Sequence, residues 1–256
     1  MEMKWKKIQI TVGPKDIWNI NGFINDINHN SLFTFENGEW TLKDDITNKK
    51  EKVVLELNKL NFINNDDPEK YIDDLFDNII NTAFVFAKNM KVDSKDSNDF
   101  QYVNNDNTVI DKIKSTLMKY FYIDDWSIID LVSDLFSALL NSHLFRNGNK
   151  RFCFSFLNVI LFTFGYLTKV KINKEFDIDV MSEKYLENIE KTIACFEVRL
   201  SNQDIDTLFT NCTNLANQNP LCFEILNNEI DLTIPERHDK TLREIKKWIK
   251  NILIFV

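Results

Sequence analysis

Residues 151–167 read RFCFSFLNVILFTFGYL, a stretch whose apolar side chains cover nearly every face of a helix. It is a little short for a membrane span, and three polar residues, Ser155, Asn158 and Thr163, interrupt it. Segments with amphipathic helical periodicity lie on both sides, which favours a central helix buried in a bundle. Gly165 marks the expected C-terminal end of this helix. The sequence therefore predicts a mostly α-helical fold.

Outward from this stretch, apolar residues recur at helical spacing in both directions. The earliest such segment begins at Pro68, which suits the first position of a helix, with Asp67 as its cap. Pro220 and Pro235 indicate a less regular stretch before the last helix. The expected helices cover residues 68–91, 109–121, 126–142, 182–199 and 203–210, and a last segment from residue 239 onward.

The N-terminal region has a different pattern. Aromatic and β-branched residues at 32–35 and 40–42 flank Asn37-Gly38, which is a β-hairpin signal. Four apolar residues then recur at helical spacing and predict a short helix. These residues are Val53, Val54, Leu57 and Leu60. The expected fold is a helical bundle around the buried central helix, with a minor β-hairpin element.

The composition excludes several classes of function. Apolar residues make up 44% of the 256 residues and charged residues 27%, which is typical of a globular chain. A net charge of -8 leaves no basic field for phosphate backbones or anionic lipid, so neither nucleic acid nor membrane is an expected partner. The four cysteines form no CxxC pair and residues 1–5 show no signal peptide, which indicates a cytoplasmic protein with reduced thiols. The three histidines are far apart, which disfavours a zinc site.

The segment that joins the last amphipathic helix of the first half to the buried helix differs from the rest of the chain. Residues 143–151 read HLFRNGNKR. A loop that turns through Gly148 at the start of a helix exposes backbone N–H groups at the positive end of the helix dipole, which suits a phosphate. Lys150 and Arg151 add cations there, and His143 is the local side chain that exchanges a proton near neutral pH. These residues predict a phosphate cradle beside a base.

This loop resembles the signature of the Fic/Doc family, His-x-Phe-x-Asp/Asn-Gly/Ala-Asn-Lys/Gly-Arg, at six of nine positions. The matching residues are His143, Phe145, Gly148, Asn149, Lys150 and Arg151. In that family the loop joins two helices of an all-helical core, and the resemblance covers roughly residues 70–210. It implies a Fic/Doc-like catalytic core at residues 67–210, an N-terminal accessory region at 1–66 and a C-terminal helical extension at 211–256.

The resemblance also implies roles for individual residues. His143 would be the general base that takes the proton from a target hydroxyl, and Phe145 would anchor the loop in the core. The residues that bind the nucleotide phosphates would be Gly148, Asn149, Lys150 and Arg151. The position of Asn147 holds a magnesium ligand in the family, so Asn147 is the candidate metal residue. The implied function is a transferase that uses ATP and Mg²⁺ to modify a Ser, Thr or Tyr hydroxyl of a protein substrate.

Two departures from the family pattern bear on the reaction. Asn147 offers a neutral oxygen where a carboxylate is usual, so magnesium binding is expected to be weaker. Members that transfer AMP have glycine at the position of Lys150 and a second arginine at that of Phe154, whereas the death-on-curing toxins have lysine. Lys150 therefore favours transfer of the γ-phosphate, with AMP transfer (adenylylation) as the alternative. A further alternative is a catalytically weak binding module that keeps the fold and sequesters a partner.

Two other family features concern binding partners. The family's inhibitory helix carries Ser/Thr-x-x-x-Glu-Gly/Asn, and the stretch 182–188 is one residue too long to match it. A separate antitoxin protein is therefore the expected inhibitor. Family members also pair the backbone of a target with a flap hairpin before the motif, and residues 100–110, where Phe100, Tyr102 and Val103 have strand character, are the expected flap. A disordered loop is the alternative interpretation of that stretch.

Overall fold

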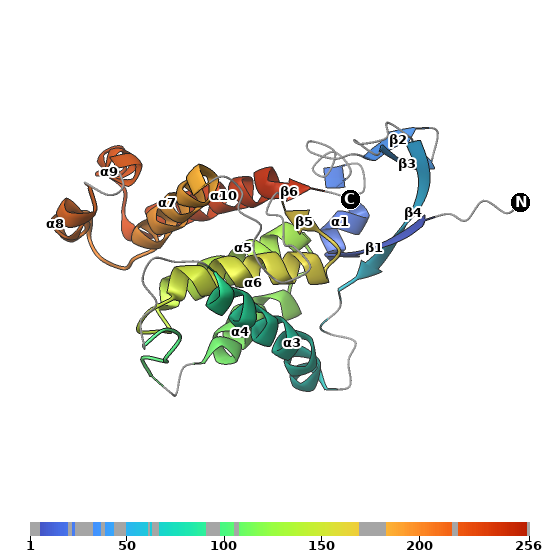
Figure 1. Cartoon of the computed structure of the whole chain (residues 1–256), viewed down its shortest axis with the longest axis horizontal. Helices are drawn as coiled ribbons and strands as arrows, with labels where there is room; N and C mark the ends of the chain where they lie inside the picture. Colours follow the sequence, from blue (N-terminus) through green and yellow to red (C-terminus); the bar gives the residue numbers. More distant parts are fainter. Residues whose placement is uncertain are drawn as a thin grey trace, which may run out of the picture.

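In the computed structural model the chain is mostly helical, with a four-stranded sheet at one end (Figure 1). The structure describes residues 6–19, 22–23, 33–36, 39–43, 50–60, 62, 67–90, 98–104, 108–168, 183–216 and 220–254. The helices are α1 (Pro14–Trp18), α3 (Pro68–Asn89), α4 (Val109–Leu117), the 3₁₀ helix η1 (Met118–Phe121), α5 (Ile128–Ser142), α6 (Asn149–Thr163), α7 (Glu183–Arg199), α8 (Ile205–Ala216), α9 (Pro220–Asn227) and α10 (Ile234–Ile252). The strands are β1 (Lys6–Val12), β2 (Phe33–Glu36), β3 (Glu39–Lys43), β4 (Lys50–Lys59), β5 (Leu167–Thr168) and β6 (Leu253–Ile254).

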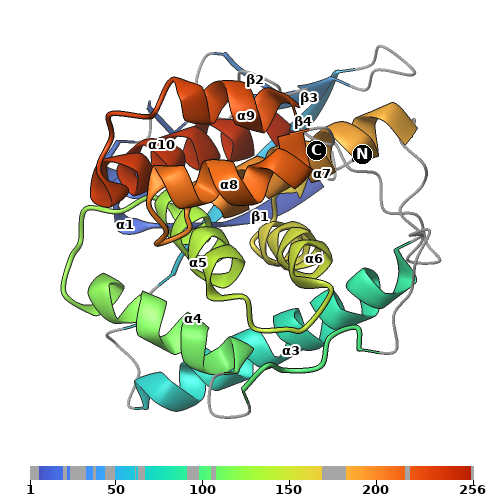
Figure 2. The ribbon, with the colours of Figure 1, turned by 90° about the vertical axis from the view of Figure 1, so that its left-hand side faces the viewer.

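Helix α6 is the buried centre of the helical part, with α3 and α5 packed against it (Figure 2). Every residue from Phe152 to Leu161 is buried, which confirms the predicted central helix, although α6 begins at Asn149 and ends at Thr163. Gly165 follows with φ 86°, and a Cβ there would lie 2.2 Å from a backbone oxygen of β1, so only glycine fits this stop. Among the described residues, no helix is long and apolar enough to cross a membrane.

The surrounding helices begin at side chains that cap them. Asp67 accepts a hydrogen bond from the backbone N–H of Lys70 at 3.0 Å, as expected of the cap of α3. Two differences from the sequence-based expectation lie near the C-terminus. The stretch expected to be irregular contains α9, which starts at Pro220, and α10 begins at Ile234 because Thr233 caps it.

The sheet is larger than the expected hairpin. Strands β2 and β3 pair antiparallel as predicted, while Asn37-Gly38 between them lies outside the described residues. Strand β4 lies between β3 and β1, antiparallel to β3 and parallel to β1. The short helix predicted over residues 53–60 is therefore wrong, because residues 53–59 pair with β1 and residues 50–53 of the same strand pair with β3. The β element is a mixed four-stranded sheet.

The first strand and α1 fix the ends of two central helices. The N–H of Thr11 donates to the carbonyl of Phe164 at 2.8 Å, and the hydroxyl of Tyr166 donates to the carbonyl of Thr11 at 2.9 Å. Asp16 on α1 accepts a hydrogen bond of 2.8 Å from the backbone N–H of Ile128, the first residue of α5. The C-terminal end of α6 and the N-terminal end of α5 therefore rest on the sheet side, and the loop between these helices lies at the opposite end (Figure 1).

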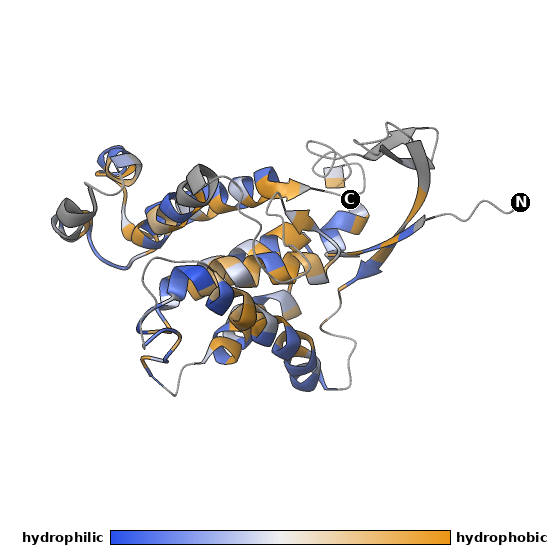
Figure 3. Cartoon of the chain, viewed as in Figure 1, coloured by the Kyte–Doolittle hydropathy of each residue, from blue (hydrophilic) through white to orange (hydrophobic). Residues whose placement is uncertain are grey.

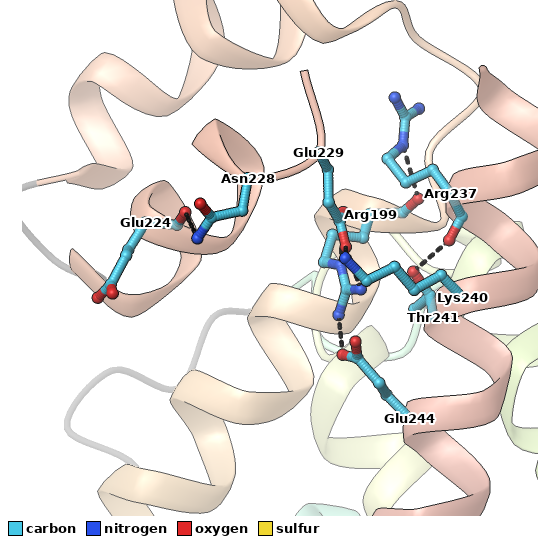
Figure 4. Close-up of polar contacts among 8 residues, drawn as sticks. All are labelled: Arg199, Glu224, Asn228, Glu229, Arg237, Lys240, Thr241 and Glu244. Carbon is cyan, nitrogen blue, oxygen red and sulfur yellow. Dashed lines mark hydrogen bonds and ion pairs between the residues drawn. The ribbon is translucent and has the colours of Figure 1, made fainter. Parts of the chain in front are cut away.

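The C-terminal helices meet around a cluster with a buried centre that we call the Arg199 network, formed by Arg199, Glu229, Arg237, Lys240 and Glu244 (Figure 4). Arg199 ends α7 and donates to both oxygens of Glu229, at 3.0 and 2.5 Å, and both side chains are 0% exposed. Its remaining nitrogen donates to Glu244 at 2.5 Å, and Lys240 pairs with Glu229 at 3.1 Å. Burial opposes the charge of Arg199, but the hydrogen bonds to Glu244 and Glu229 raise its pKa above the usual value.

Candidate functional site

The loop between α5 and α6 turns through two residues with positive φ. Helix α5 ends at Ser142, and His143 follows in the left-handed region with φ 45° and ψ 50°. Gly148 has φ 90° and directly precedes Asn149, the first residue of α6. A Cβ at position 148 would lie 2.7 Å from the ring of Phe100, so both the dihedral angle and the space favour glycine. The predicted helix–loop–helix arrangement is confirmed.

Asn149 and Phe145 brace this loop from inside. The side-chain amide of Asn149 donates to the carbonyl of Phe145 at 2.5 Å, and its oxygen accepts from the N–H of Phe145 at 2.9 Å. Phe145 is buried, with its ring centroid 5.5 Å from that of Phe84 and 5.2 Å from that of Phe152. The anchoring role expected of Phe145 is confirmed. The side chain of Asn149 is used within the loop, so its expected contact with an anion rests on its backbone N–H alone.

The stretch expected to be a flap pairs with the loop itself. The N–H of Val103 donates to the carbonyl of Leu144 at 2.9 Å, and the N–H of Arg146 donates to the carbonyl of Gln101 at 2.9 Å. Residues 109–110 belong to α4, and residues 105–107 lie outside the described residues. The expectation of a flap over 100–110 is therefore wrong for its last residues. The backbone of residues 98–104 pairs with the loop between α5 and α6.

Asp99 adds to the loop a carboxylate that the sequence pattern does not predict. Its Oδ1 accepts a hydrogen bond from the side-chain amide of Asn147 at 2.6 Å and lies 2.8 Å from Nη2 of Arg151. Arg151 also stacks over the ring of Phe100, at 5.1 Å from its centroid. The side chains of Arg151 and Asp99 are only 15% and 14% exposed. A phosphate that binds Arg151 has to share this cation with Asp99 or displace it.

Glu197 adds a second carboxylate, from the last turns of α7. Its Oε2 lies 3.3 Å from Nζ of Lys150, and its Oε1 lies 3.7 Å from Nδ1 of His143. Lys150 is the residue expected to bind phosphate and His143 the one expected to transfer a proton, and the two stand seven positions apart. In the fold, both side chains lie next to the carboxylate of Glu197.

The exposed side of the loop is where chemistry can occur. The side chain of His143 is 59% exposed and that of Lys150 is 40% exposed, so both are accessible to a ligand from solvent. Figure 3 shows a hydrophilic first turn of α6, followed by a largely apolar remainder. A base and a cation therefore stand side by side at the N-terminal end of a helix whose backbone dipole attracts anions.

The expected magnesium ligand does not form a metal site with its neighbours. The side-chain oxygen of Asn147 accepts a hydrogen bond from the N–H of Gly148 at 2.9 Å, and its side-chain nitrogen donates to Asp99. Both polar atoms of the side-chain amide therefore already have a partner. The one carboxylate next to it, Asp99, is paired with Arg151. In the described part of the chain, no group of three or more His, Cys, Asp or Glu side chains could hold a metal ion. These residues do not fit a magnesium ion by themselves.

Asp99 and Glu197 carry no local signal in the sequence. Asp99 lies in an Asp- and Asn-rich stretch that reads as a loop, and Glu197 has no motif around it. Asp99 lies 48 residues before Asn147, and Glu197 lies 47 residues after Lys150. No protein-family model, curated protein sequence or solved structure matches this chain. Its function is therefore inferred from the residues and contacts of the loop.

Proposed function

We propose that this protein is an ATP-dependent transferase that modifies a hydroxyl group of another protein, with a Fic/Doc-like active site in the loop 143–151. The observation that carries the proposal is the convergence of His143 and Lys150 on Glu197 at the N-terminal end of α6. A base and a cation are thereby held together at a helix N-terminus, where the first backbone N–H groups have no partner within the helix. Both side chains are accessible, which a purely structural cluster does not require.

The reaction we propose is transfer of the γ-phosphate. The target hydroxyl oxygen attacks Pγ of ATP, the bond between Pγ and the oxygen that bridges it to Pβ breaks, and ADP leaves. His143 takes the hydroxyl proton, while Lys150 and the N–H groups of the first turn of α6 neutralise charge on the phosphate oxygens. Arg151 contributes once it exchanges part of its contact with Asp99 for phosphate. Any magnesium would have to arrive bound to the nucleotide, and it would then neutralise charge on the phosphates.

The choice between phosphate and AMP rests on Lys150. Its resemblance to the lysine of the death-on-curing toxins favours the γ-phosphate, and its ammonium group at the helix N-terminus is a compact charge suited to a terminal phosphate. Transfer of AMP, with attack on Pα and release of pyrophosphate, is the alternative reaction in the same site.

One observation favours a different class of function. Both cations of the loop already have a carboxylate partner, Asp99 for Arg151 and Glu197 for Lys150, and Asn147 replaces an acidic residue. Charges that are balanced from within need no nucleotide to neutralise them. The second candidate is therefore a binding module that keeps this helical core and holds a protein partner without transfer.

One experiment separates the three candidates. The purified protein is incubated with bacterial lysate, Mg²⁺ and ATP labelled with radioactive phosphorus at either the α or the γ position, and the proteins are separated by electrophoresis. Label from the γ position alone is the expected result. Label from the α position identifies AMP transfer instead. Absence of label from both positions contradicts the transferase and leaves the binding module.

A further inference from the structure

We propose that Glu197 is a positioning residue, which fixes the tautomer of His143 and holds Lys150 beside it; this rests on the proposed function. Glu197 lies on α7, outside the loop, and its side chain is 14% exposed. Its two oxygens are divided between two partners. Oε1 faces Nδ1 of His143 at 3.7 Å, and Oε2 faces Nζ of Lys150 at 3.3 Å.

The carboxylate determines which nitrogen of His143 can act as a base. An ionised carboxylate only accepts hydrogen bonds, so the ring nitrogen that faces it carries the proton in the neutral imidazole. The distance of 3.7 Å is longer than a hydrogen bond, but the negative charge of Glu197 still attracts a proton on the nearer nitrogen, Nδ1. We therefore expect Nε2 to hold the lone pair and to be the nitrogen available to a target hydroxyl. Without this partner a side chain that is 59% exposed has no preferred ring orientation.

The same carboxylate restrains Lys150. A lysine on four flexible carbons loses side-chain entropy when it binds a phosphate, and an existing ion pair reduces that loss. Glu197 also affects the pKa of a thiol in α6, that of Cys153. Burial raises the pKa of the Cys153 thiol, and Glu197 raises it further, while Lys150 acts in the opposite direction. Cys153 therefore stays protonated, and His143 and Lys150 remain the reactive groups of this corner.

The helix that carries Glu197 is fixed on both sides of it. Phe196 is buried and packs edge-on against Trp248 of α10, with ring centroids 5.7 Å apart. Two residues after Glu197, Arg199 is held by the Arg199 network. A carboxylate on such an element has few positions to adopt, which is what a positioning residue requires.

The test of the tautomer needs no turnover. Nitrogen-15 NMR of the imidazole rings distinguishes the Nδ1–H form from the Nε2–H form. The spectra are recorded at a pH high enough for histidine to be neutral. The signals of His143 are identified by their loss in His143→Asn. We expect the Nδ1–H form in the natural protein and in Glu190→Gln, which removes an exposed carboxylate from the same helix. In Glu197→Leu, which removes both carboxylate oxygens, the population of the Nε2–H form should increase.

Kinetics then separate positioning from a purely structural role. Glu197→Gln keeps the shape of the side chain, and we expect kcat to fall about tenfold, the size of effect common for a residue that orients a functional histidine. The KM for ATP should rise through Lys150, and Glu190→Gln should change neither quantity. An unchanged tautomer in Glu197→Leu, or faster transfer with tighter ATP binding in Glu197→Gln, overturns the proposal. If the natural protein transfers no label, the proposed function fails, and the NMR comparison alone decides the role of Glu197.

Discussion

Helix α7 contributes to two ionic clusters, and they differ in what they leave accessible. In the Arg199 network, Arg199 and Glu229 are both 0% exposed, and each nitrogen of the guanidinium group has a carboxylate partner. In the loop cluster, which we define as His143, Asn147, Lys150 and Arg151 with Asp99 and Glu197, exposure rises from 14% at the carboxylates to 59% at His143. The first cluster is built on a pair that no ligand can reach from outside, although Lys240 and Glu244 at its edge are 39% and 40% exposed. The second cluster contains no fully buried pair.

This difference in exposure distinguishes a structural ionic cluster from a candidate site. Removing one partner of a fully buried pair leaves an uncompensated charge without water, so the free energy of unfolding falls steeply. A partly exposed pair is screened, and water or a ligand can replace either partner. The Arg199 network should therefore respond to substitution through stability, and the loop cluster through binding and transfer.

The largest effect on stability is expected at Glu229. Replacing it by glutamine removes the charge opposite Arg199 and Lys240, so we expect the free energy of unfolding to fall by about 3–5 kcal/mol. Urea denaturation measures this change. Glu224→Gln, on the exposed side of α9 in the same region, is the matched control and should stay within about 0.5 kcal/mol (Figure 4). Equal losses of unfolding free energy in the two variants would contradict the structural role of the buried Arg199–Glu229 pair.

The next effect is expected at Arg151. Replacing it by alanine removes a charge-assisted contact to phosphate worth about 1.5–3 kcal/mol, so the Kd for ATP should rise about tenfold or more. Arg146→Ala removes the same charge from an exposed position in the same loop and should change the Kd by less than about twofold. Isothermal titration calorimetry provides both values. Similar losses in the two variants would show that Arg151 acts only through net charge.

The smallest effect is expected at Asn147. An aspartate there faces Asp99 across the present hydrogen bond of 2.6 Å, so Asn147→Asp should lower the free energy of unfolding by about 1 kcal/mol without metal. Two neighbouring carboxylates can then hold magnesium, and adding Mg²⁺ should raise the melting temperature of the variant but not that of the natural protein. Sodium chloride of equal ionic strength is the control. If the melting temperature of Asn147→Asp does not change on addition of Mg²⁺, no metal binds at this position.

The parts of the fold that were predicted correctly are those with a local signal. The all-round apolar pattern of 151–167 predicted the buried helix, and Gly165 predicted its end, because burial and a left-handed turn each require particular residues. The prediction failed over residues 53–60, where apolar residues fit a helix but form β4. Short apolar segments fit both the helical and the strand period, and here pairing with β1 along residues 53–59 decides for the strand.

The same limit applies to the candidate site. The turn at Gly148 and the anchor Phe145 follow from residues within the loop, so the sequence predicted them. Asp99 and Glu197 reach the loop from other elements, and no pattern within the loop specifies them. The inward orientation of the Asn147 amide was missed for the same reason, since its partner Asp99 lies outside the motif.

The most direct test of the account compares label transfer from ATP by the natural protein and by His143→Asn. Asparagine tolerates the left-handed backbone at this position but cannot act as a base, so the substitution isolates proton transfer. We expect transfer to the lysate target to fall at least about a hundredfold while the Kd for ATP stays the same. His238→Asn, on α10, is the matched control and should transfer normally. Transfer by His143→Asn within about tenfold of the natural protein would contradict the account.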